Sequence, residues 1–376
     1  MPTKKSKVAE RWVDRLRIWV DALVLDAKAA GVGQYIRSLC EAYGALFPED
    51  QVFGFLQPNI AIPGVASLTV PDSASSARRM LYEQTQLAGV VKRRGYDAIH
   101  FADYQMPLWR PLPRSVITVH DLAAFVLPDV FEPSKTRAKR YVLSRSVRRA
   151  SRIIVPSQAT KRDLIDILRV PAEKIHVVMH GVKSAGQPLE GRVHERPYFL
   201  AVGTVEPRKN FSRMIQAYHL LVQRSRDVPD LVIAGRWGWM YHETLELPEK
   251  LGVAQNVKFL QYVSEDTLTT LYRDAQAMIY PSLYEGFGLP VIEAMRAGIP
   301  VVTTNGGALA ELGADAPWRA DPLDIEDLAD KMQQVIHAGP DVGRRVRQAQ
   351  EWTSQLTWEC AAKKTREVYH EAALGG

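Results

Sequence analysis

The stretch Tyr280-Pro-Ser-Leu-Tyr-Glu-Gly-Phe-Gly-Leu-Pro-Val-Ile-Glu-Ala-Met-Arg-Ala-Gly-Ile-Pro300 joins the end of a strand, a glycine loop and a helix. The apolar run Ala277–Tyr280 predicts a buried strand, and Pro290 suits the first turn of a helix. Glu285 then falls in the loop, and Glu293 lies about one turn into the helix. A strand, a loop and a helix in this order are the repeating unit of a parallel sheet covered by helices.

The same alternation recurs along the rest of the chain. Short apolar runs separated by helical stretches predict further strands at Arg17–Asp21, Ala98–His100, Ser115–Val119, Arg152–Val155, Ile175–Val178, Tyr198–Val202, Leu231–Ala234, Val257–Leu260 and Pro300–Thr303. The segment Gly181–Pro197 is polar and rich in Gly and Pro, which is typical of a linker. We therefore predict two doubly wound α/β domains, residues 1–190 and 191–376, that face each other across a cleft.

Composition limits the class of protein. A length of 376 residues fits two domains of roughly 100–200 residues each, and 46% hydrophobic residues are enough for two cores. Cys40 and Cys360 lie far apart, which argues against a disulfide framework or a zinc site and favours a reducing cytoplasm. Met1–Arg17 is basic and has no signal-peptide run. No window approaches the roughly 18 apolar residues of a spanning helix.

Positive charge is concentrated in one block. Lys135–Arg162 holds ten basic residues and no acidic one, within a net charge of +6. Such a block suits a polyanion, namely nucleic acid, acidic lipid or a phosphorylated substrate, although a solvated helix face is the alternative. Leu143, Val147 and Ala150 are spaced to form an apolar helix edge, which suits either a membrane surface or the protein core.

The two glutamates of the glycine loop and its helix indicate a ligand with hydroxyl groups. Carboxylates accept hydrogen bonds from hydroxyls, which ribose and hexose supply. Gly286 and Gly288 let the backbone approach a ligand, and amides at a helix start bind phosphate. Together these features describe a nucleotide-sugar site. The alternative is that Glu293 only complements the helix dipole and Glu285 is a surface residue.

A second group of residues suits a diphosphate. The strand Phe199–Val202 leads into Gly203, and Arg208 and Lys209 stand just before a helix for which Asn210 is a plausible cap. Arginine offers a planar fork and lysine a point charge, so the pair can hold two phosphate groups. A plain surface location is the alternative.

In the first half of the chain, His120 follows the predicted strand Ser115–Val119. A histidine at this edge could bond the sugar or move a proton, with Asp121 as its orienting partner. A structural histidine is the alternative. The loop that ends at Gly33 also precedes a helix. Because it lacks the third glycine of a dinucleotide fingerprint, it favours a phosphate-adjacent loop over an NAD site.

These residues resemble a known family. Glu285–Glu293 is similar to the Glu-x7-Glu motif of the retaining glycosyltransferases of family 4, which have the GT-B fold, and Val202–Asn210 is similar to their donor-phosphate segment. Gly31–Tyr35, Thr118–Leu122 and Val155–Lys161 resemble signatures of their N-terminal domain. The likeness runs from about Leu16 to near the C-terminus, with the motifs in the family's order.

The resemblance implies roles for the donor-side residues. Arg208 and Lys209 would bind the donor diphosphate in the segment that includes Gly203, and Glu293 would bind the ribose hydroxyls. Glu285 would contact the transferred sugar. It would be helped by the backbone amides of Gly286, Phe287, Gly288 and Leu289.

The resemblance also places groups of the first domain. His120 would lie beside the sugar, and Gly33 close to the phosphates. The last helix, at about residues 358–373, would cross back onto the first domain. No Asp-x-Asp pair stands near the phosphate segment, so neither a metal nor another cofactor is expected.

The subtype is suggested by His100–Tyr104 and Gly235–Trp239, which resemble bacterial mannosyltransferases of surface-polysaccharide and O-antigen assembly. Phe101–Asp103 departs from the Gly-Pro-Asn common there, which leaves the acceptor open. We expect transfer of a hexose, with mannose from GDP-mannose preferred over a UDP-sugar, onto a glycan or a polyprenyl-diphosphate-linked acceptor. Lys135–Arg152 would dock an anionic membrane surface on the cytoplasmic face.

Three other functions are weighed against this one. A phosphorylase of similar architecture requires a lysine placed for pyridoxal phosphate, and none is identified. A nucleic-acid-binding protein would use the basic block but leaves the glutamate loop unexplained, so no nucleic acid is expected as a partner. An NAD enzyme is disfavoured by the incomplete glycine loop.

Overall fold

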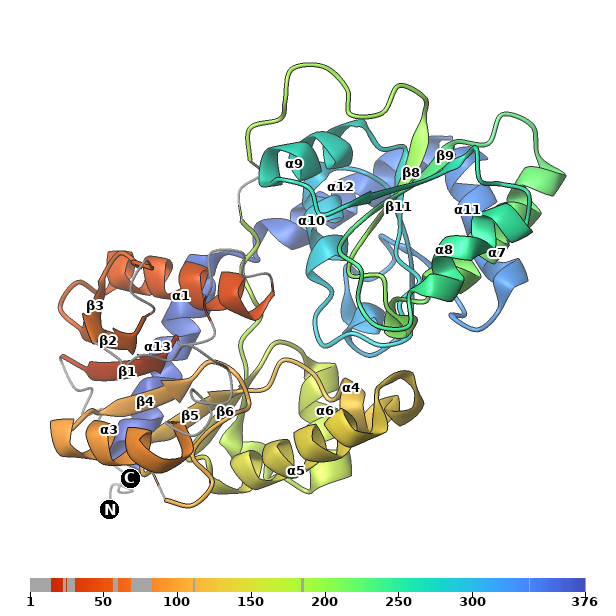
Figure 1. Cartoon of the computed structure of the whole chain (residues 1–376). Coiled ribbons are helices and arrows are strands. Elements are labelled where there is room, and N and C mark those ends of the chain that lie inside the picture. The colour runs from red at the N-terminus through yellow and green to blue at the C-terminus, as the bar shows by residue number, and fades with distance from the viewer. Residues whose placement is uncertain are drawn as a thin grey trace, which may run out of the picture.

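A computed structural model describes residues 15–22, 25, 31–56, 60–68, 83–110, 112–183, 186–337 and 339–375. These residues form two parallel sheets, each with helices on both faces (Figure 1). The predicted α/β class with two Rossmann-like units is confirmed.

The first sheet has the strand order β3-β2-β1-β4-β5-β6-β7 among the described residues. Its strands are β1 (Arg17–Asp21), β2 (Gln51–Phe55), β3 (Val65–Leu68), β4 (Ala98–Phe101), β5 (Ser115–Thr118), β6 (Arg152–Val155) and β7 (Ile175–Val177). The helices that follow them are α1 (Val32–Leu46), α3 (Ala88–Arg94), α4 (Ala123–Val126), α5 (Pro133–Arg149) and α6 (Gln158–Leu168).

The second sheet repeats the same winding, with the order β10-β9-β8-β11-β12-β13 in the described part of the chain. Its strands are β8 (Tyr198–Val202), β9 (Asp230–Ala234), β10 (Val257–Gln261), β11 (Ala277–Ile279), β12 (Val301–Thr304) and β13 (Trp318–Ala320). Its helices are α7 (Phe211–Arg224), α8 (His242–Lys250), α9 (Glu265–Asp274), α10 (Leu289–Ala297), α11 (Ile325–His337) and α12 (Pro340–Ser354).

The strand order fixes where a ligand can bind. In each sheet the chain winds outward from a central strand, reverses, and winds to the other side, so the order reverses between β1 and β4 and between β8 and β11. Loops at the carboxyl ends of these two strand pairs diverge and leave a crevice. In the second sheet those loops carry Lys209, after β8, and Glu285, after β11.

The chain crosses between the two sheets twice. The first crossing follows β7, and the second precedes the last helix, α13 (Trp358–Leu374), which packs on α1 and on β4, β5 and β6 of the first sheet (Figure 1). The crossings touch, because the amide of Val182 donates to the carbonyl of Leu356 at 3.0 Å. Gly181 has no room for a side chain, since a Cβ there would lie 2.3 Å from the amide nitrogen of Trp358.

Candidate active site

Glu285 is the centre of a buried polar cluster rather than a surface residue. Its side chain is 10% exposed. Its Oε1 accepts hydrogen bonds from Lys209 Nζ at 2.6 Å, Ser282 Oγ at 2.7 Å and the Tyr280 hydroxyl at 3.0 Å. Its Oε2 pairs with Arg208 Nη1 at 2.8 Å. Both oxygens of the carboxylate are therefore held in fixed positions.

The charges in this cluster stabilise one another. Burial alone would raise the pKa of the Glu285 carboxyl, but Arg208 and Lys209 lower it to about 2. Burial lowers the pKa of Lys209, and Glu285 opposes that effect. Glu285 is thus ionised at neutral pH, and two cations are concentrated beside it, as binding a diphosphate requires.

Backbone contacts fix the loop after β8 to the loop after β11. The carbonyl of Arg208 accepts from the amide of Leu283 at 2.9 Å and from Ser282 Oγ at 3.1 Å. Asn210 stands at the N-cap of α7 with φ of 61°, but its side chain does not cap the helix. Its Nδ2 instead donates to the carbonyl of Pro281 at 3.0 Å. Asn210 therefore takes the predicted N-cap position, but its side chain ties the two loops together and makes no capping bond.

The glycine loop ends at the start of α10, as the position of Pro290 predicts. Gly288 is the N-cap residue and Leu289 is the first residue of the helix. Main-chain amides in the first turn have no partner within a helix and carry its positive dipole end. Phe287 is buried against the His180 ring at 4.9 Å, and the Gly286 carbonyl accepts from Thr160 Oγ1 at 3.3 Å. The loop therefore contacts the first domain.

Glu293 lies on α10, apart from the Glu285 cluster. It is half-buried and accepts a hydrogen bond from the Tyr272 hydroxyl at 3.0 Å. Burial raises the pKa of its carboxyl from an ordinary 4.5 to about 7, although the Tyr272 hydrogen bond opposes the rise. Unlike Glu285, this carboxyl has no cation within ion-pair distance among the described residues. The two glutamates therefore differ in charge near neutral pH.

His120 follows β5 and faces the glycine loop from the first domain. Its Nε2 lies 3.0 Å from the carbonyl of Ala102, and its ring packs edge-on against Tyr35 at 5.0 Å. Asp121 does not orient it, because that carboxylate pairs with Lys139 Nζ at 3.8 Å. The orienting role expected for Asp121 is wrong. The main chain of His120 is so close to Gly286 that a Cβ on Gly286 would lie 1.8 Å from the His120 carbonyl oxygen.

The two remaining glycines lie next to these groups. Gly203 directly follows β8, and its amide donates to the carbonyl of Ala234 at 2.9 Å. Gly33 is in the first turn of α1, two residues before Tyr35, whose ring packs on His120. Residues 26–30, just before this helix, lie outside the described residues.

Known protein families match most of the sequence that forms these two sheets. A family model described as "Glycosyltransferase Family 4" matches residues 29–186, and one described as "Glycosyl transferases group 1" matches residues 187–352. The chain is 30% identical over 305 residues to the O-antigen chain mannosyltransferase B of Escherichia coli, covering 78% of this chain and 79% of that protein. The chain belongs to the family 4 glycosyltransferases.

Solved structures agree on the fold of this glycosyltransferase. Sucrose-phosphate synthase from Thermosynechococcus elongatus superposes with a TM-score of 0.74 at 20% identity, covering 94% of this chain and 98% of that one. Anabaena HepE, solved in complex with UDP-glucose, gives 0.70 at 18% identity with the same shares. The predicted GT-B fold is confirmed.

Sequence reasoning missed several groups around the glycine loop of the glycosyltransferase. Tyr280 and Ser282 bond to Glu285, and their position just after a strand was the available signal. Tyr284 bonds Asp163 of the first domain at 2.5 Å. Nothing in the sequence joins these two residues, because the contact depends on how the domains pack.

The basic block is divided among several environments in the glycosyltransferase. Leu143, Val147 and Ala150 are buried, so the helix edge they form is core and not a membrane-facing edge. Other basic side chains are engaged within the protein: Arg140 with the carbonyl of Ala124, Lys161 with that of Ile175, Arg152 with Glu371 and Arg162 with Glu311. Exposed side chains on α5 include Arg137, Arg145 and Arg148. Among the described side chains of α5, these arginines form the exposed basic face.

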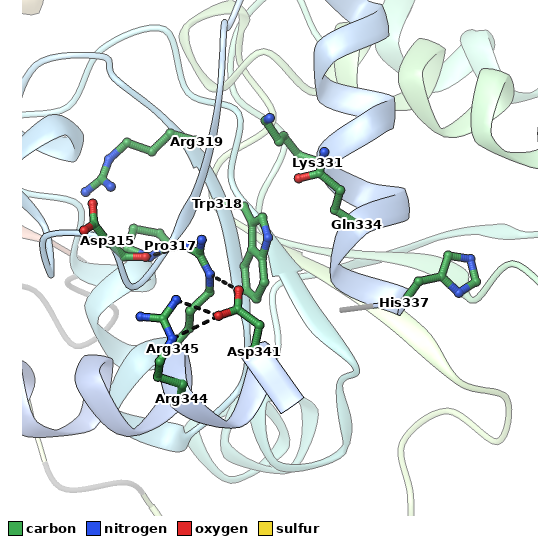
Figure 2. Close-up of a pocket in the computed structure, with 10 residues that line it drawn as sticks. All are labelled: Asp315, Pro317, Trp318, Arg319, Lys331, Gln334, His337, Asp341, Arg344 and Arg345. Carbon is green, nitrogen blue, oxygen red and sulfur yellow. Dashed lines mark hydrogen bonds and ion pairs between the residues drawn. The ribbon is translucent and has the colours of Figure 1, made fainter. Parts of the chain in front are cut away.

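A surface pocket elsewhere in the glycosyltransferase contains none of the predicted site residues (Figure 2). It lies among β13, α11 and α12. Asp341 neutralises part of its positive charge, with its carboxylate 2.6 Å from Arg344 Nη2 and 2.7 Å from Arg345 Nε. In the described residues, no cluster of three potential metal ligands occurs, and no helix is long and apolar enough to cross a membrane.

The raised pKa of Glu293 predicts opposite effects of pH on stability and on donor binding. Between an unfolded pKa near 4.5 and a folded pKa of about 7, the folded state keeps a proton that the unfolded state has lost. This group's contribution to stability is therefore full below pH 4.5 and is lost as the pH rises through 7. If the ionised carboxylate accepts both ribose hydroxyls, the affinity for donor should instead rise over the same range.

Glu293→Gln tests both effects. The variant should unfold at a higher temperature than wild type at pH 8 but not at pH 5, and its affinity for a nucleotide-sugar such as GDP-mannose should no longer change with pH. Thermal unfolding and titration calorimetry measure the two quantities. The ligand in the titration is GDP-mannose and not GDP, because the diphosphate of GDP-mannose has no terminal phosphate group whose own charge changes near pH 7. Equal pH dependence of donor affinity in both proteins would contradict the role of Glu293.

Proposed function

We propose that this glycosyltransferase transfers mannose from GDP-mannose, with retention of the anomeric configuration, in the assembly of a bacterial surface polysaccharide. The observation that carries the proposal is the cluster of Arg208, Lys209 and Glu285 at the strand reversal of the second sheet. The mannosyl donor is favoured by the 30% identity to an O-antigen mannosyltransferase. The acceptor is a glycan or a polyprenyl-diphosphate-linked sugar.

The chemistry follows from the charges in the cluster. When the bond between the anomeric carbon and the diphosphate oxygen breaks, negative charge grows on the leaving nucleoside diphosphate. Arg208 and Lys209 are already oriented by Glu285, so they can stabilise that charge without rearranging. Amides at the start of α10 add the positive end of a helix dipole. In this proposal the protein's own cations supply the stabilisation, and no metal is needed.

The other residues bind the parts of the donor that do not react. Glu285 accepts hydrogen bonds from the sugar hydroxyls, and Glu293 accepts them from the ribose. His120 stands opposite, at the edge of the first sheet, where the sugar would meet the acceptor. Contact between the domains around Gly286 excludes water from the reacting bond, which limits loss of the donor by hydrolysis.

The choice of donor is tested by a panel of nucleotide-sugars. GDP-mannose, GDP-fucose, UDP-glucose and UDP-N-acetylglucosamine are incubated separately with the full-length protein, and release of nucleoside diphosphate is measured. GDP-mannose should turn over fastest, and an NMR spectrum of the early sugar product should show the α anomer. The second candidate is a UDP-sugar donor, which the likeness to HepE with UDP-glucose favours. Preference for a UDP-sugar would replace the GDP-mannose assignment.

We further propose that the exposed face of α5 docks the glycosyltransferase on the inner, anionic surface of the cell membrane. Arg137, Arg145 and Arg148 are exposed there, and arginines near an anionic bilayer gain about 1 kcal/mol each. Co-sedimentation with phosphatidylglycerol vesicles should exceed that with phosphatidylcholine vesicles and should fall on adding salt. Equal recovery with both vesicle types would exclude this docking mode.

A further inference from the structure

Tyr284, the residue before Glu285, bonds to the first domain through its side chain. The residue is buried, 4% exposed, and its hydroxyl lies 2.5 Å from Oδ2 of Asp163 on α6. The amide of Leu122 donates to the same hydroxyl oxygen at 3.4 Å. Burial and the Asp163 carboxylate both raise the pKa of Tyr284, so the phenol keeps its proton and donates a hydrogen bond to Asp163. This is a partly buried, charge-assisted hydrogen bond between the domains, with Tyr284 buried and Asp163 half-buried.

The backbone of Tyr284 reaches the catalytic groups. Its carbonyl accepts a hydrogen bond from Arg208 Nη1 at 3.0 Å, the same atom that pairs with Glu285. On the other side of Glu285, the carbonyl of Gly286 accepts from Thr160, which also belongs to α6. The two residues that flank Glu285 are therefore both held by one helix of the first domain.

The remaining contacts of α6 with the second domain are of a weaker kind. Arg162 pairs with Glu311 at 2.7 Å, with the arginine side chain 60% exposed, and the amide of Gln158 donates to Glu311 at 3.0 Å. Exposed ion pairs contribute little because water and salt screen them. The Tyr284–Asp163 bond is better shielded from water, since Tyr284 is buried, and it adjoins Glu285, so its loss should affect the reaction most.

We propose that Tyr284 is a positioning residue that aligns Glu285 and Arg208 only while α6 of the first domain is docked. The donor would bind to the second domain whether or not this bond is made, whereas turnover would require it. The inference rests on the proposed function, since the aligned groups are those that act on the nucleotide-sugar. Closure of the domains would then be required to align the reacting groups, in addition to excluding water from them.

The test compares Tyr284→Phe, Asp163→Asn and the double variant in the full-length protein. Tyr284→Phe removes only the hydroxyl, and Asp163→Asn removes only the charge. Each should lower kcat for hydrolysis of GDP-mannose by about tenfold or more, the effect of losing a hydrogen bond to a charged group. The KM for the donor should stay within about twofold, because ground-state binding is retained. The double variant should be no slower than the slower single variant, since both remove one bond.

Tyr218→Phe is the matched control. Tyr218 is buried in the second domain, and its hydroxyl donates to the carbonyl of Pro229 at 2.9 Å, away from α6. Its loss should leave kcat unchanged. An unchanged kcat in Tyr284→Phe, or a double variant whose loss is the product of the single losses, would overturn the positioning role.

A second measurement needs no donor. Spin labels are placed at the exposed positions Arg148 on α5 and Glu246 on α8, after Cys360→Ser removes the exposed cysteine. Tyr284→Phe should shift the distance distribution toward separated domains, and Tyr218→Phe should not. If wild type turns over no nucleotide-sugar, the proposed function fails, whereas an unshifted distribution in Tyr284→Phe overturns this inference on its own.

Discussion

Replacing Glu285 with glutamine is expected to lower the rate of sugar transfer by about 10²–10³-fold, the usual cost of removing one preorganised electrostatic group. The glutamine keeps the size of the side chain but cannot compensate Arg208 and Lys209, which lie 2.8 and 2.6 Å from the carboxylate. Lys209 would lose its carboxylate partner, and Arg208 would keep only Glu206 and the Tyr284 carbonyl to orient it. Nucleoside diphosphate release from GDP-mannose measures the loss.

The same substitution should destabilise the fold. Breaking a buried ion pair by removing one partner costs about 3–5 kcal/mol, and here the Lys209 ammonium would remain buried without the carboxylate it pairs with, whereas Arg208 keeps its ion pair with Glu206. Urea unfolding of both proteins measures this difference. Glu265→Gln is the control, since Glu265 is 75% exposed and, in the described part of the chain, forms an ion pair with Lys183 alone. If Glu285→Gln matched Glu265→Gln in rate and stability, the cluster would have no role in either.

Substituting alanine for Gly286 should lower transfer by about a hundredfold or more, as expected when the reacting groups are displaced by an ångström. The added Cβ would lie 1.8 Å from the carbonyl oxygen of His120 and 2.9 Å from Cβ of Asp121. Those atoms belong to the first domain and His120 contributes backbone, so the domains would have to separate. The backbone of Gly286 is not in the left-handed region, so alanine is not strained within its own loop.

Gly343→Ala controls for the substitution itself. A Cβ on Gly343 would meet only the end of the Arg347 side chain, at 3.5 Å. This control should retain wild-type rates. Gly286→Ala should unfold near the wild-type temperature, because the core of each domain is intact, and should expand in small-angle scattering. Full activity in Gly286→Ala would show that the contact between Gly286 and His120 is not needed in the state of the protein that carries out the reaction.

The strands could be predicted where apolar runs are long and alternate with helices. β1, β6 and β8 have the predicted bounds, β12 is shifted by one residue at both ends, and the other predicted strands differ by one residue at one end. β2, β3 and β13 were missed. β3 and β13 are edge strands of three or four residues, β13 carries Arg319 at its centre, and β2 contains Gly54. Such segments become strands because a neighbour supplies hydrogen bonds, which local sequence does not record.

The sequence predicted those residues of the candidate site that directly follow the ends of strands. Lys209 and Glu285 are 76 residues apart, yet both follow strands that flank the reversal of the sheet, and the structure brings them within 2.6 Å. The bonds of Asn210 to Pro281, of His120 to Ala102 and of Tyr284 to Asp163 were not predictable. They depend on loop conformation and on docking of the domains, which leave no periodic pattern in one sequence.

The most direct test of the proposed mechanism is turnover of GDP-mannose by Lys209→Ala. The ammonium of Lys209 bonds Glu285 and is assigned to the leaving diphosphate, so its removal should slow release of labelled mannose from the donor by about a hundredfold or more. Lys331→Ala, on α11 and paired with Asp327, should match wild type. The predicted result is that wild type releases mannose from GDP-mannose and that Lys209→Ala does so about a hundredfold more slowly, or more slowly still. Equal rates in wild type and Lys209→Ala, in variants that circular dichroism shows to be folded, would contradict the assignment of the donor site.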